Sequence, residues 1–330
     1  MAEHLLLWLN GQADLRIAYS FTLDEIVVCL QDIVNRPGVY GIPSQCVGNL
    51  MSIHQNVTRL RSVIPQHYKA KRGVEIANFY NSCPDGSDYL IPPPSQNIAR
   101  EPNPHWPSAV ASLRLIKWKH EGIAYWALPD LLGLFMSSLG SAPTGATKRN
   151  FYLPLTAVFG QWCMKLLGEG KWPAIFQCTW TEAGEYCLGA SRGGFAARGI
   201  GGSWLAVLDR ARYGVIRSPL LTLANWSQAW TPTIRASGRG RGTPFGRCGE
   251  TYPFRRILMA RRTAEEAGRV HGLALSKRYI GIAHMYDDRL SGVIWRSLVD
   301  PCANCRFLIS LHNGDVTNFD KEAGREGAPP

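Results

Sequence analysis

Two short segments in the C-terminal half of the chain carry side chains that could perform chemistry. They are Cys248-Gly249-Glu250 and Pro301-Cys302-Ala303-Asn304-Cys305. Three thiolates can hold a zinc ion and leave its fourth tetrahedral position to a water molecule, whose pKa the metal lowers. A carboxylate that does not bind the metal can take the water proton and pass it to a ring nitrogen and to the leaving ammonia. The segments therefore predict zinc at Cys248, Cys302 and Cys305, with Glu250 as the proton shuttle in hydrolysis of an amidine-type C–NH₂ group.

Two helices must position these residues. The sequence predicts helices over Thr251–Arg262 and Arg306–His312, each directly after one of the two segments. A helix N-terminus carries a partial positive charge, which offsets part of the single net negative charge that three thiolates leave on Zn²⁺. We expect Arg247 and Arg306, each adjacent to a predicted ligand, to offset more of that charge.

In this order, the two segments resemble the signature of the cytidine-deaminase-like superfamily in its three-cysteine form. The strings Cys248–Pro253 and Asp300–Cys305 are most similar to the deaminases of bacterial polymorphic toxins and their fungal relatives. The resemblance extends from about Ala174 to the C-terminus. It implies a cytidine-deaminase-like domain, which is an α/β fold of three layers with a mixed β-sheet, together with zinc at the three cysteines and Glu250 as the proton shuttle.

The chain departs from the family pattern in two places. Gly249 stands where the family usually has alanine, and the gap between the two segments is longer than in compact nucleoside deaminases. The longer gap predicts an insertion, which we place at Leu275–Leu290. We also expect strands over Val293–Val299, before the second segment, and over Asp315–Phe319, after it.

The charge of the chain favours a polyanionic partner, with nucleic acid as the first candidate. The net charge is +11 and the pI is about 9.3. A group of arginines surrounds the first segment: Arg235, Arg239, Arg241, Arg247, Arg255, Arg256, Arg261 and Arg262. We expect four of them to contact the phosphates of single-stranded DNA or RNA, namely Arg239, Arg241, Arg247 and Arg255. Gly238–Gly242 is an arginine–glycine segment of the type that follows a nucleic-acid backbone. A solvated basic face is the alternative interpretation.

Three functions remain open at this point. The first is conversion of cytosine to uracil in single-stranded nucleic acid, with adenine or guanine as alternative bases. The second is deamination of free nucleosides or nucleotides, and the third is a non-catalytic deaminase-fold protein that keeps zinc for stability. A structural zinc site would need a fourth ligand, which His271, His284 or His312 could supply. The arginines favour the first function, and Glu250 argues against the third because structural zinc does not use such a carboxylate.

The length of the chain allows two domains with separate cores, since it has 330 residues. We expect a mainly helical N-terminal region of unassigned role over residues 1–150 and the deaminase domain over residues 151–330. Pro92–Pro107 is too rich in proline to continue a helix or a central strand, so we interpret it as a linker or an extended surface segment.

Local patterns predict several further elements. Leu23–Ile33 and Cys46–Ile64 have apolar residues at helical spacing. Ala174–Trp180 and Glu185–Ala190 are rich in β-forming residues and flank a turn that contains glycine, which predicts a β-hairpin. Leu128–Leu139 is a further predicted helix.

The cysteines indicate a reducing compartment. They number nine, which is odd, and they are spread over the chain without a repeating framework. No apolar run is long enough to cross a bilayer, and the N-terminus lacks the basic region of a signal peptide. We therefore expect an intracellular protein of the cytoplasm or nucleus that does not bind membranes, and we leave its oligomeric state open.

Overall fold

The computed structural model describes residues 5–62, 115–167, 173–192, 212–220, 245–287 and 292–325. The proline-rich segment Pro92–Pro107 and two of the predicted phosphate contacts, Arg239 and Arg241, lie outside these residues. The described part of the chain combines helices with two small antiparallel sheets, which is compatible with the expected α/β class. None of its helices is long and apolar enough to cross a membrane.

The central sheet has four strands in the order β4-β3-β5-β6. β3 (Ile175–Thr181) and β4 (Tyr186–Ala190) form the predicted hairpin, and Gly184 adopts the positive φ of +83° that its turn uses. β5 (Val270–Ser276) pairs along the other side of β3, and β6 (Leu298–Val299) pairs with β5.

The mixed sheet that we expected is not found in the described residues, because every strand pair there is antiparallel. The chain leaves β5 into α12 (Lys277–Ile280) and comes back to the same edge, where Ala274 pairs with Val299 and Leu275 pairs with Leu298. A strand that starts from the end of the sheet where its neighbour finished runs antiparallel to that neighbour. A parallel neighbour instead needs a crossover connection back to the opposite end of the sheet.

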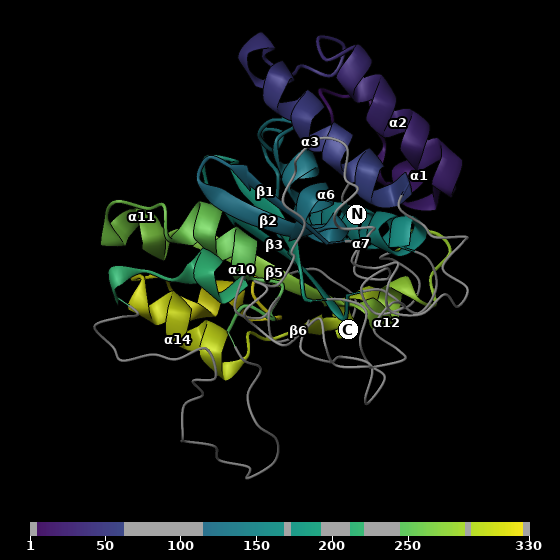
Figure 1. Ribbon diagram of the computed structural model, residues 1–330. Coiled ribbons are helices and arrows are strands. Elements are labelled where there is room, and N and C mark those ends of the chain that lie inside the picture. The colour runs from purple at the N-terminus through teal and green to yellow at the C-terminus, as the bar shows by residue number, and fades with distance from the viewer. Residues whose placement is uncertain are drawn as a thin grey trace, which may run out of the picture.

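One face of the central sheet is covered by α6 (Leu128–Ser137) and α7 (Leu153–Leu167) (Figure 1). Side chains alternate between the two faces of a strand, and Phe176 and Cys178 of β3 point to this side. Both are fully buried in one hydrophobic core with the two helices. The helix predicted over Leu128–Leu139 is confirmed.

The opposite face of the sheet is covered by helices from the C-terminal part of the chain. They are α10 (Thr251–Pro253), the π-helical turn η3 (Phe254–Leu258), α14 (Ala303–Leu311) and the 3₁₀ turn η4 (Val316–Phe319). Apolar side chains of η3, α14 and η4 enclose a second core with Cys187 of β4, whereas Tyr252 of α10 belongs to the first core. The sheet therefore separates two helical layers, and both cysteine segments belong to the C-terminal one.

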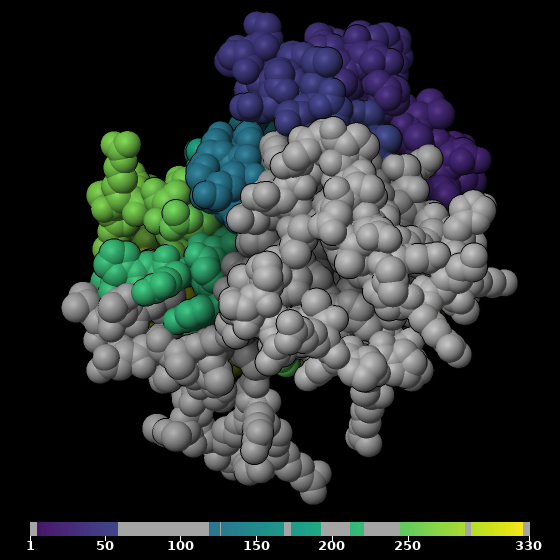
Figure 2. Space-filling view, viewed as in Figure 1, coloured from purple at the N-terminus to yellow at the C-terminus, as the bar shows by residue number. Residues whose placement is uncertain are grey.

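The N-terminal helices pack on the outer side of α6 and α7, at the purple end of the molecule (Figures 1 and 2). They are α1 (Leu15–Ser20), α2 (Leu23–Asn35) and α3 (Ser44–Ser62), and the last two confirm predicted helices. α2 begins at a capping box, in which the Thr22 hydroxyl accepts from the backbone N–H of Glu25 and the Glu25 carboxylate accepts from the backbone N–H of Thr22.

β1 (Leu115–His120) and β2 (Ile123–Ala127) form a separate antiparallel pair.

The larger hydrophobic core crosses the boundary that we predicted at residue 150. It contains residues of α1 and α2 together with residues of α7 and β3. The indole N–H of Trp162 donates to the carbonyl oxygen of Ala18 over 2.8 Å, and Trp8 packs against the same indole. The division into residues 1–150 and 151–330 stays a prediction, but the N-terminal helices and the sheet share one apolar core.

Two expected strands are largely absent, and local hydrogen bonds explain why. Val293–Arg296 forms the helical turn α13, and Gly292 before it adopts a left-handed φ of +55°. The backbone N–H and the hydroxyl of Ser297 both donate to the carbonyl oxygen of Val293 and end the turn. Residues 316–319 form η4 because the Asp315 carboxylate accepts from the N–H and hydroxyl of Thr317. Such side-chain bonds compete with strand pairing.

Candidate metal centre

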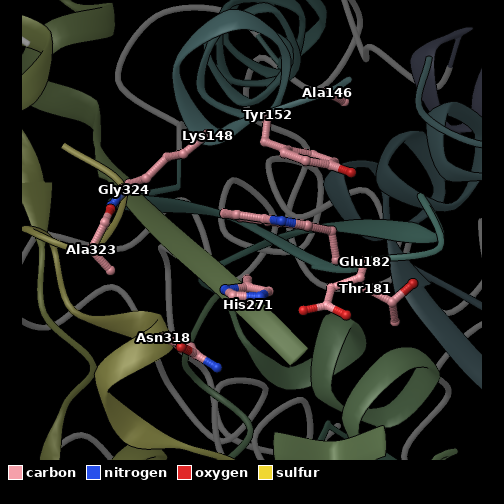
Figure 3. A pocket seen from close by; sticks show the side chains of 10 residues that line it. Ala146, Lys148, Tyr152, Thr181, Glu182, His271, Asn318, Ala323 and Gly324 are labelled. Atoms are coloured by element: carbon pink, nitrogen blue, oxygen red, sulfur yellow. The ribbon is translucent and has the colours of Figure 1, made fainter. Parts of the chain in front are cut away.

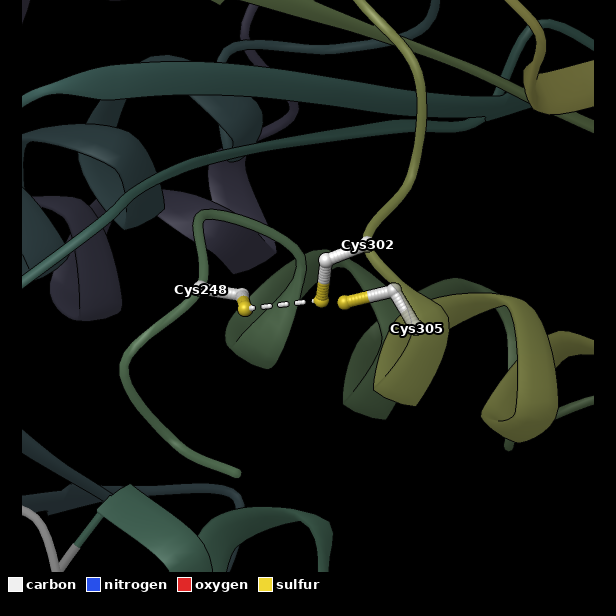
Figure 4. Close-up of side chains that lie close together, drawn as sticks. All are labelled: Cys248, Cys302 and Cys305. Atoms are coloured by element: carbon white, nitrogen blue, oxygen red, sulfur yellow. Dashed lines mark hydrogen bonds between the residues drawn. The ribbon is translucent and has the colours of Figure 1, made fainter. Parts of the chain in front are cut away.

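The structure brings the three predicted metal ligands together. The Sγ atoms of Cys248 and Cys302 lie 3.6 Å apart although 54 positions separate the residues, and all three Sγ atoms lie within 4.8 Å of one another. Figure 4 shows the three side chains pointing toward a common centre. Zinc–sulfur bonds of about 2.3 Å at tetrahedral angles place two sulfurs about 3.8 Å apart, whereas a disulfide requires about 2.05 Å. The donor set therefore fits a metal ion, and all three cysteines are free thiols.

The cysteines are positioned by two helix starts. Cys302 is the N-cap of α14 and Cys305 lies in its first turn, so the C-x-x-C spacing directs both sulfurs to one side of the helix start. Cys248 lies in the turn that leads into α10, where its carbonyl oxygen accepts from the hydroxyl of Thr251 over 2.9 Å. The helix predicted over Thr251–Arg262 runs over α10 and η3 only, and the helix predicted over Arg306–His312 begins three residues earlier, at Ala303.

The three thiols do not ionise alike. Hydrogen bonds from the thiols of Cys248 and Cys305 lower the pKa of Cys302 to about 3, and the backbone N–H groups of Cys305 and Asn304 contribute to the same shift. Hydrogen bonding to Cys302 raises the pKa of Cys248 well above its usual value. Hydrogen bonds with Cys248 and Cys302, together with burial, raise the pKa of Cys305 in the same way. The cluster thus holds one thiolate and two thiols at neutral pH, and a metal ion would displace the two remaining protons.

Glu250 lies beside the sulfur cluster without belonging to its ligand group. It is only 6% exposed, and it caps α10, where its carbonyl oxygen accepts from the backbone N–H of Phe254 over 2.8 Å. Burial raises the pKa of Glu250 to about 7, the Cys302 thiolate adds to the rise, and a hydrogen bond with Cys305 partly offsets it. The group of side chains close enough to share one metal contains only the three cysteines, among the described residues. The carboxylate is therefore a buried, titratable group next to the centre, which is the environment that tunes a general acid or base.

Gly249 packs directly on the central sheet. A Cβ atom at this position would lie 3.2 Å from the Cβ of Gln177 on β3 and 3.5 Å from the backbone N of Ser191 after β4. The first distance is tighter than ordinary van der Waals contact, so alanine would need a small displacement of the turn. This close approach is a physical reason for glycine where the resembling family usually has alanine.

Two of the four predicted phosphate contacts, Arg247 and Arg255, lie within the described residues. Arg255 lies half-buried on η3 and helps burial to lower the pKa of His312, and Arg247 is half-buried with its carbonyl accepting from the N–H of Arg192 over 2.9 Å. Arg256 pairs with Glu121 at 3.2 Å. Phosphate contact by Arg247 and Arg255, like that by Arg239 and Arg241, stays a prediction.

Arg306 connects two segments next to the second pair of cysteines. Its guanidinium donates to the carboxylate of Asp320 over 2.8 Å and to the carbonyl oxygen of Pro301 over 3.2 Å. It thus joins the residues before Cys302 to the segment after η4. Compensation of the thiolate charge by Arg306, like that by Arg247, stays a prediction.

Sequence reasoning missed a buried ion pair behind the Cys248 turn. Arg212 is 1% exposed, and its guanidinium donates to the carboxylate of Asp130 on α6 over 2.5 Å. The same group donates to the carbonyl oxygens of Gly246, Ala190 and Cys248. Nothing in the sequence distinguishes Arg212 from the neighbouring Arg210, and an acid in the first turn of a helix such as α6 is common on the surface. Burial is the property that singles out this pair, and it depends on tertiary structure.

The three histidines that we considered as a fourth ligand lie elsewhere. His312 follows the C-terminal end of α14, about 15 Å along the helix axis from Cys302 and about 10 Å from Cys305. His271 stacks on Trp180 and lines a pocket of about 350 Å³ with Tyr152 and Lys148 (Figure 3). That pocket lies where β3 ends and β5 begins, whereas the cysteine turn packs against the start of β3. His284 is not part of the cysteine group.

Comparison with known proteins gives no family assignment. No protein-family model, no curated protein and no solved structure matches the chain.

Proposed function

We propose that this chain is a zinc-dependent hydrolytic deaminase that converts cytosine to uracil in single-stranded nucleic acid. The observation that carries the proposal is the placement of Glu250. Its carboxylate is buried against a three-sulfur centre and does not take part in the ligand group. A structural metal site has no use for such a group, whereas hydrolysis needs a proton carrier at this place.

Each residue then has a definite task. Cys248, Cys302 and Cys305 would hold zinc through three thiolates, and the ion would supply a Lewis acid that lowers the pKa of a water molecule. Glu250 would take one proton from that water and deliver it to the ring nitrogen as the oxygen bonds to the ring carbon. It would then take the second proton from the oxygen and deliver it to the amino group, which leaves as ammonia. Burial raises the pKa of this carboxyl to about 7 in the metal-free cluster, and a group with a pKa near ambient pH accepts and releases protons with similar ease.

The proposed fold is that of the cytidine-deaminase-like superfamily. In support of it, a β-hairpin is followed by the first cysteine segment at a helix start, then by a strand, and then by the second cysteine segment at another helix start. Helices lie on both faces of the sheet, as this fold requires. The antiparallel β6 is a departure, and it lies within the strand expected over Val293–Val299, outside the predicted insertion.

Nucleic acid is favoured as substrate by charge. The net charge of +11 attracts polyanions, and Arg255 lies on the helical segment that begins at Glu250. Arg239 and Arg241 precede the first segment within an arginine–glycine stretch. A base within a duplex cannot reach a buried carboxylate, so a single strand or an extruded base is the form that this centre could accept.

The test is incubation of the purified, zinc-loaded protein with single-stranded DNA, single-stranded RNA and free cytidine in parallel, with mass spectrometry as the readout. Conversion of cytosine to uracil in a polymer supports the proposal. Conversion of cytidine alone would replace it by a deaminase of free nucleosides. Absence of conversion in all three, with zinc bound, would refute catalysis on cytosine.

A further inference from the structure

We propose that Arg212, held in place by Asp130, is the positioning residue that fixes the Cys248 turn for metal binding. The inference rests on the metal centre of the proposed function and concerns no residue that touches the metal. It assigns a role to a buried guanidinium and to a carboxylate of α6, a helix that lies outside the two cysteine segments.

The geometry of Arg212 connects three parts of the chain. One amino group donates to Asp130 on α6 over 2.5 Å, and the other donates to the carbonyl oxygen of Ala190, at the end of β4, over 2.9 Å. The second amino group also donates to the carbonyl of Cys248 over 3.1 Å, and Nε donates to the carbonyl of Gly246 over 2.5 Å. The backbone carbonyls at both ends of the segment 246–248 are therefore hydrogen-bonded to the same side chain, that of Arg212.

The turn packs closely against the chain that carries Arg212. Gly246 adopts a φ of +85°, and a Cβ there would lie 2.6 Å from the backbone N of Tyr213. The backbone next to Arg212 thus approaches the turn too closely for any side chain. The carbonyl oxygens of Gly246 and Cys248 both accept from the guanidinium, and that of Cys248 also accepts from the hydroxyl of Thr251, so Arg212 and Thr251 together satisfy the backbone of the turn.

Only arginine can make this set of contacts. Its planar guanidinium presents five N–H donors in fixed directions, whereas a lysine ammonium presents three donors at one point. The guanidinium also lies over the ring of Tyr252, 5.2 Å from its centroid, so the start of α10 packs on the same group. Asp130 neutralises the charge and fixes the orientation of the fork.

Arg212 also contacts the backbone of the first ligand directly, since its guanidinium donates to the carbonyl oxygen of Cys248. Its charge is paired with that of Asp130, so the effect of losing the guanidinium on the metal centre is mechanical. The Cys248 turn would loosen, and the ligand that it carries would be less well placed.

The experiment compares Arg212→Lys and Asp130→Asn with wild type by titration with Co²⁺ and Zn²⁺, without substrate. We expect binding weaker by about 10- to 100-fold and altered intensity of the Co²⁺ absorption bands, because outer partners of ligands have effects of this size. Ile33→Ala is the matched control, since it opens a cavity in the fully buried core of α2 and contacts neither the turn nor Asp130. It should lower the melting temperature and leave metal affinity unchanged.

Two further measurements distinguish an effect of Arg212 on the position of the Cys248 turn from an effect on the overall stability of the protein. Hydrogen exchange of residues 246–251 in the metal-free protein should accelerate in Arg212→Lys and not in Ile33→Ala, and this readout needs neither metal nor activity. The double variant Arg212→Met/Asp130→Leu removes both charges; it should recover stability relative to Arg212→Met and not recover metal affinity. The inference is overturned if Arg212→Lys keeps wild-type exchange and metal affinity, or if the double variant regains affinity. Absence of deamination in wild type would refute the proposed function and leave this result intact.

Discussion

A Cβ atom on Gly189 would lie 2.5 Å from the carbonyl oxygen of Gly249. Strand β4 and the Cys248 turn are thus in backbone contact, and there is no room for a side chain between them. Gly189→Ala should push the turn away from the sheet at a cost of about 1–3 kcal/mol, as overpacking does. Because the displaced turn carries a ligand, zinc affinity should fall along with the free energy of unfolding, which denaturant titration with and without zinc would measure.

The control for this prediction is Gly48→Ala on α3. A Cβ there would meet nothing within 4 Å, and alanine in a helix interior stabilises by about 0.5–1 kcal/mol relative to glycine. Its zinc affinity should equal that of wild type. If Gly189→Ala binds zinc as tightly as Gly48→Ala, the close packing of β4 is not needed for the metal site.

The ligand assignment predicts the metal content of cysteine variants. Wild type should contain about one zinc per chain, and Cys302→Ser and Cys305→Ser should lose it because a tetrahedral site with two thiolates is incomplete. Cys178→Ala is the control, since that thiol is fully buried on the other face of β3. Elemental analysis of freshly purified protein gives the answer, and a zinc-free wild type would remove the basis of the proposal.

The ionisation of the cluster predicts how many protons zinc displaces. At pH 7 the depressed pKa of Cys302 leaves it a thiolate, while the raised pKa values of Cys248 and Cys305 keep those groups protonated. Three thiolates are needed for zinc, so binding should release about two protons. Calorimetry of the Glu250→Gln variant in buffers of different ionisation enthalpy measures this number without a contribution from the neighbouring carboxylate. Release of three protons, or of none, would contradict the assignment of charge within the cluster.

The basic segment before Cys248 predicts the salt dependence of nucleic-acid binding. Arg239→Ala/Arg241→Ala should weaken binding to a single strand and reduce the log–log salt slope by roughly 0.7 for each phosphate that the variant no longer neutralises. Arg36→Ala/Arg269→Ala removes the same charge from surface ion pairs elsewhere and should change the slope little. An unchanged slope in the first variant would show that the arginines form a solvated face, and the free-nucleoside alternative would then be favoured.

What the sequence could predict here was local. The spacing of Cys302 and Cys305 at a helix start, the hairpin of β3 and β4 and the helix over Leu23–Ile33 each depend on residues a few positions apart, and all are found. The sequence could not identify Arg212 and Asp130, because their importance arises from burial between α6 and the Cys248 turn. Val293–Val299 has the composition of a strand, yet Gly292 and Ser297 close a helical turn there. Tertiary context decided the first outcome, and a local competition for backbone hydrogen bonds decided the second.

The central claim is that Glu250 moves the proton in a zinc-dependent deamination. The direct test is the rate of cytosine-to-uracil conversion in single-stranded substrate by Glu250→Gln, compared with wild type at equal zinc content. The amide has nearly the shape of the carboxylate and cannot accept and return a proton, so the rate should fall about 100- to 10,000-fold while zinc and the fold are retained. Wild-type conversion by a zinc-loaded Glu250→Gln protein would contradict the account.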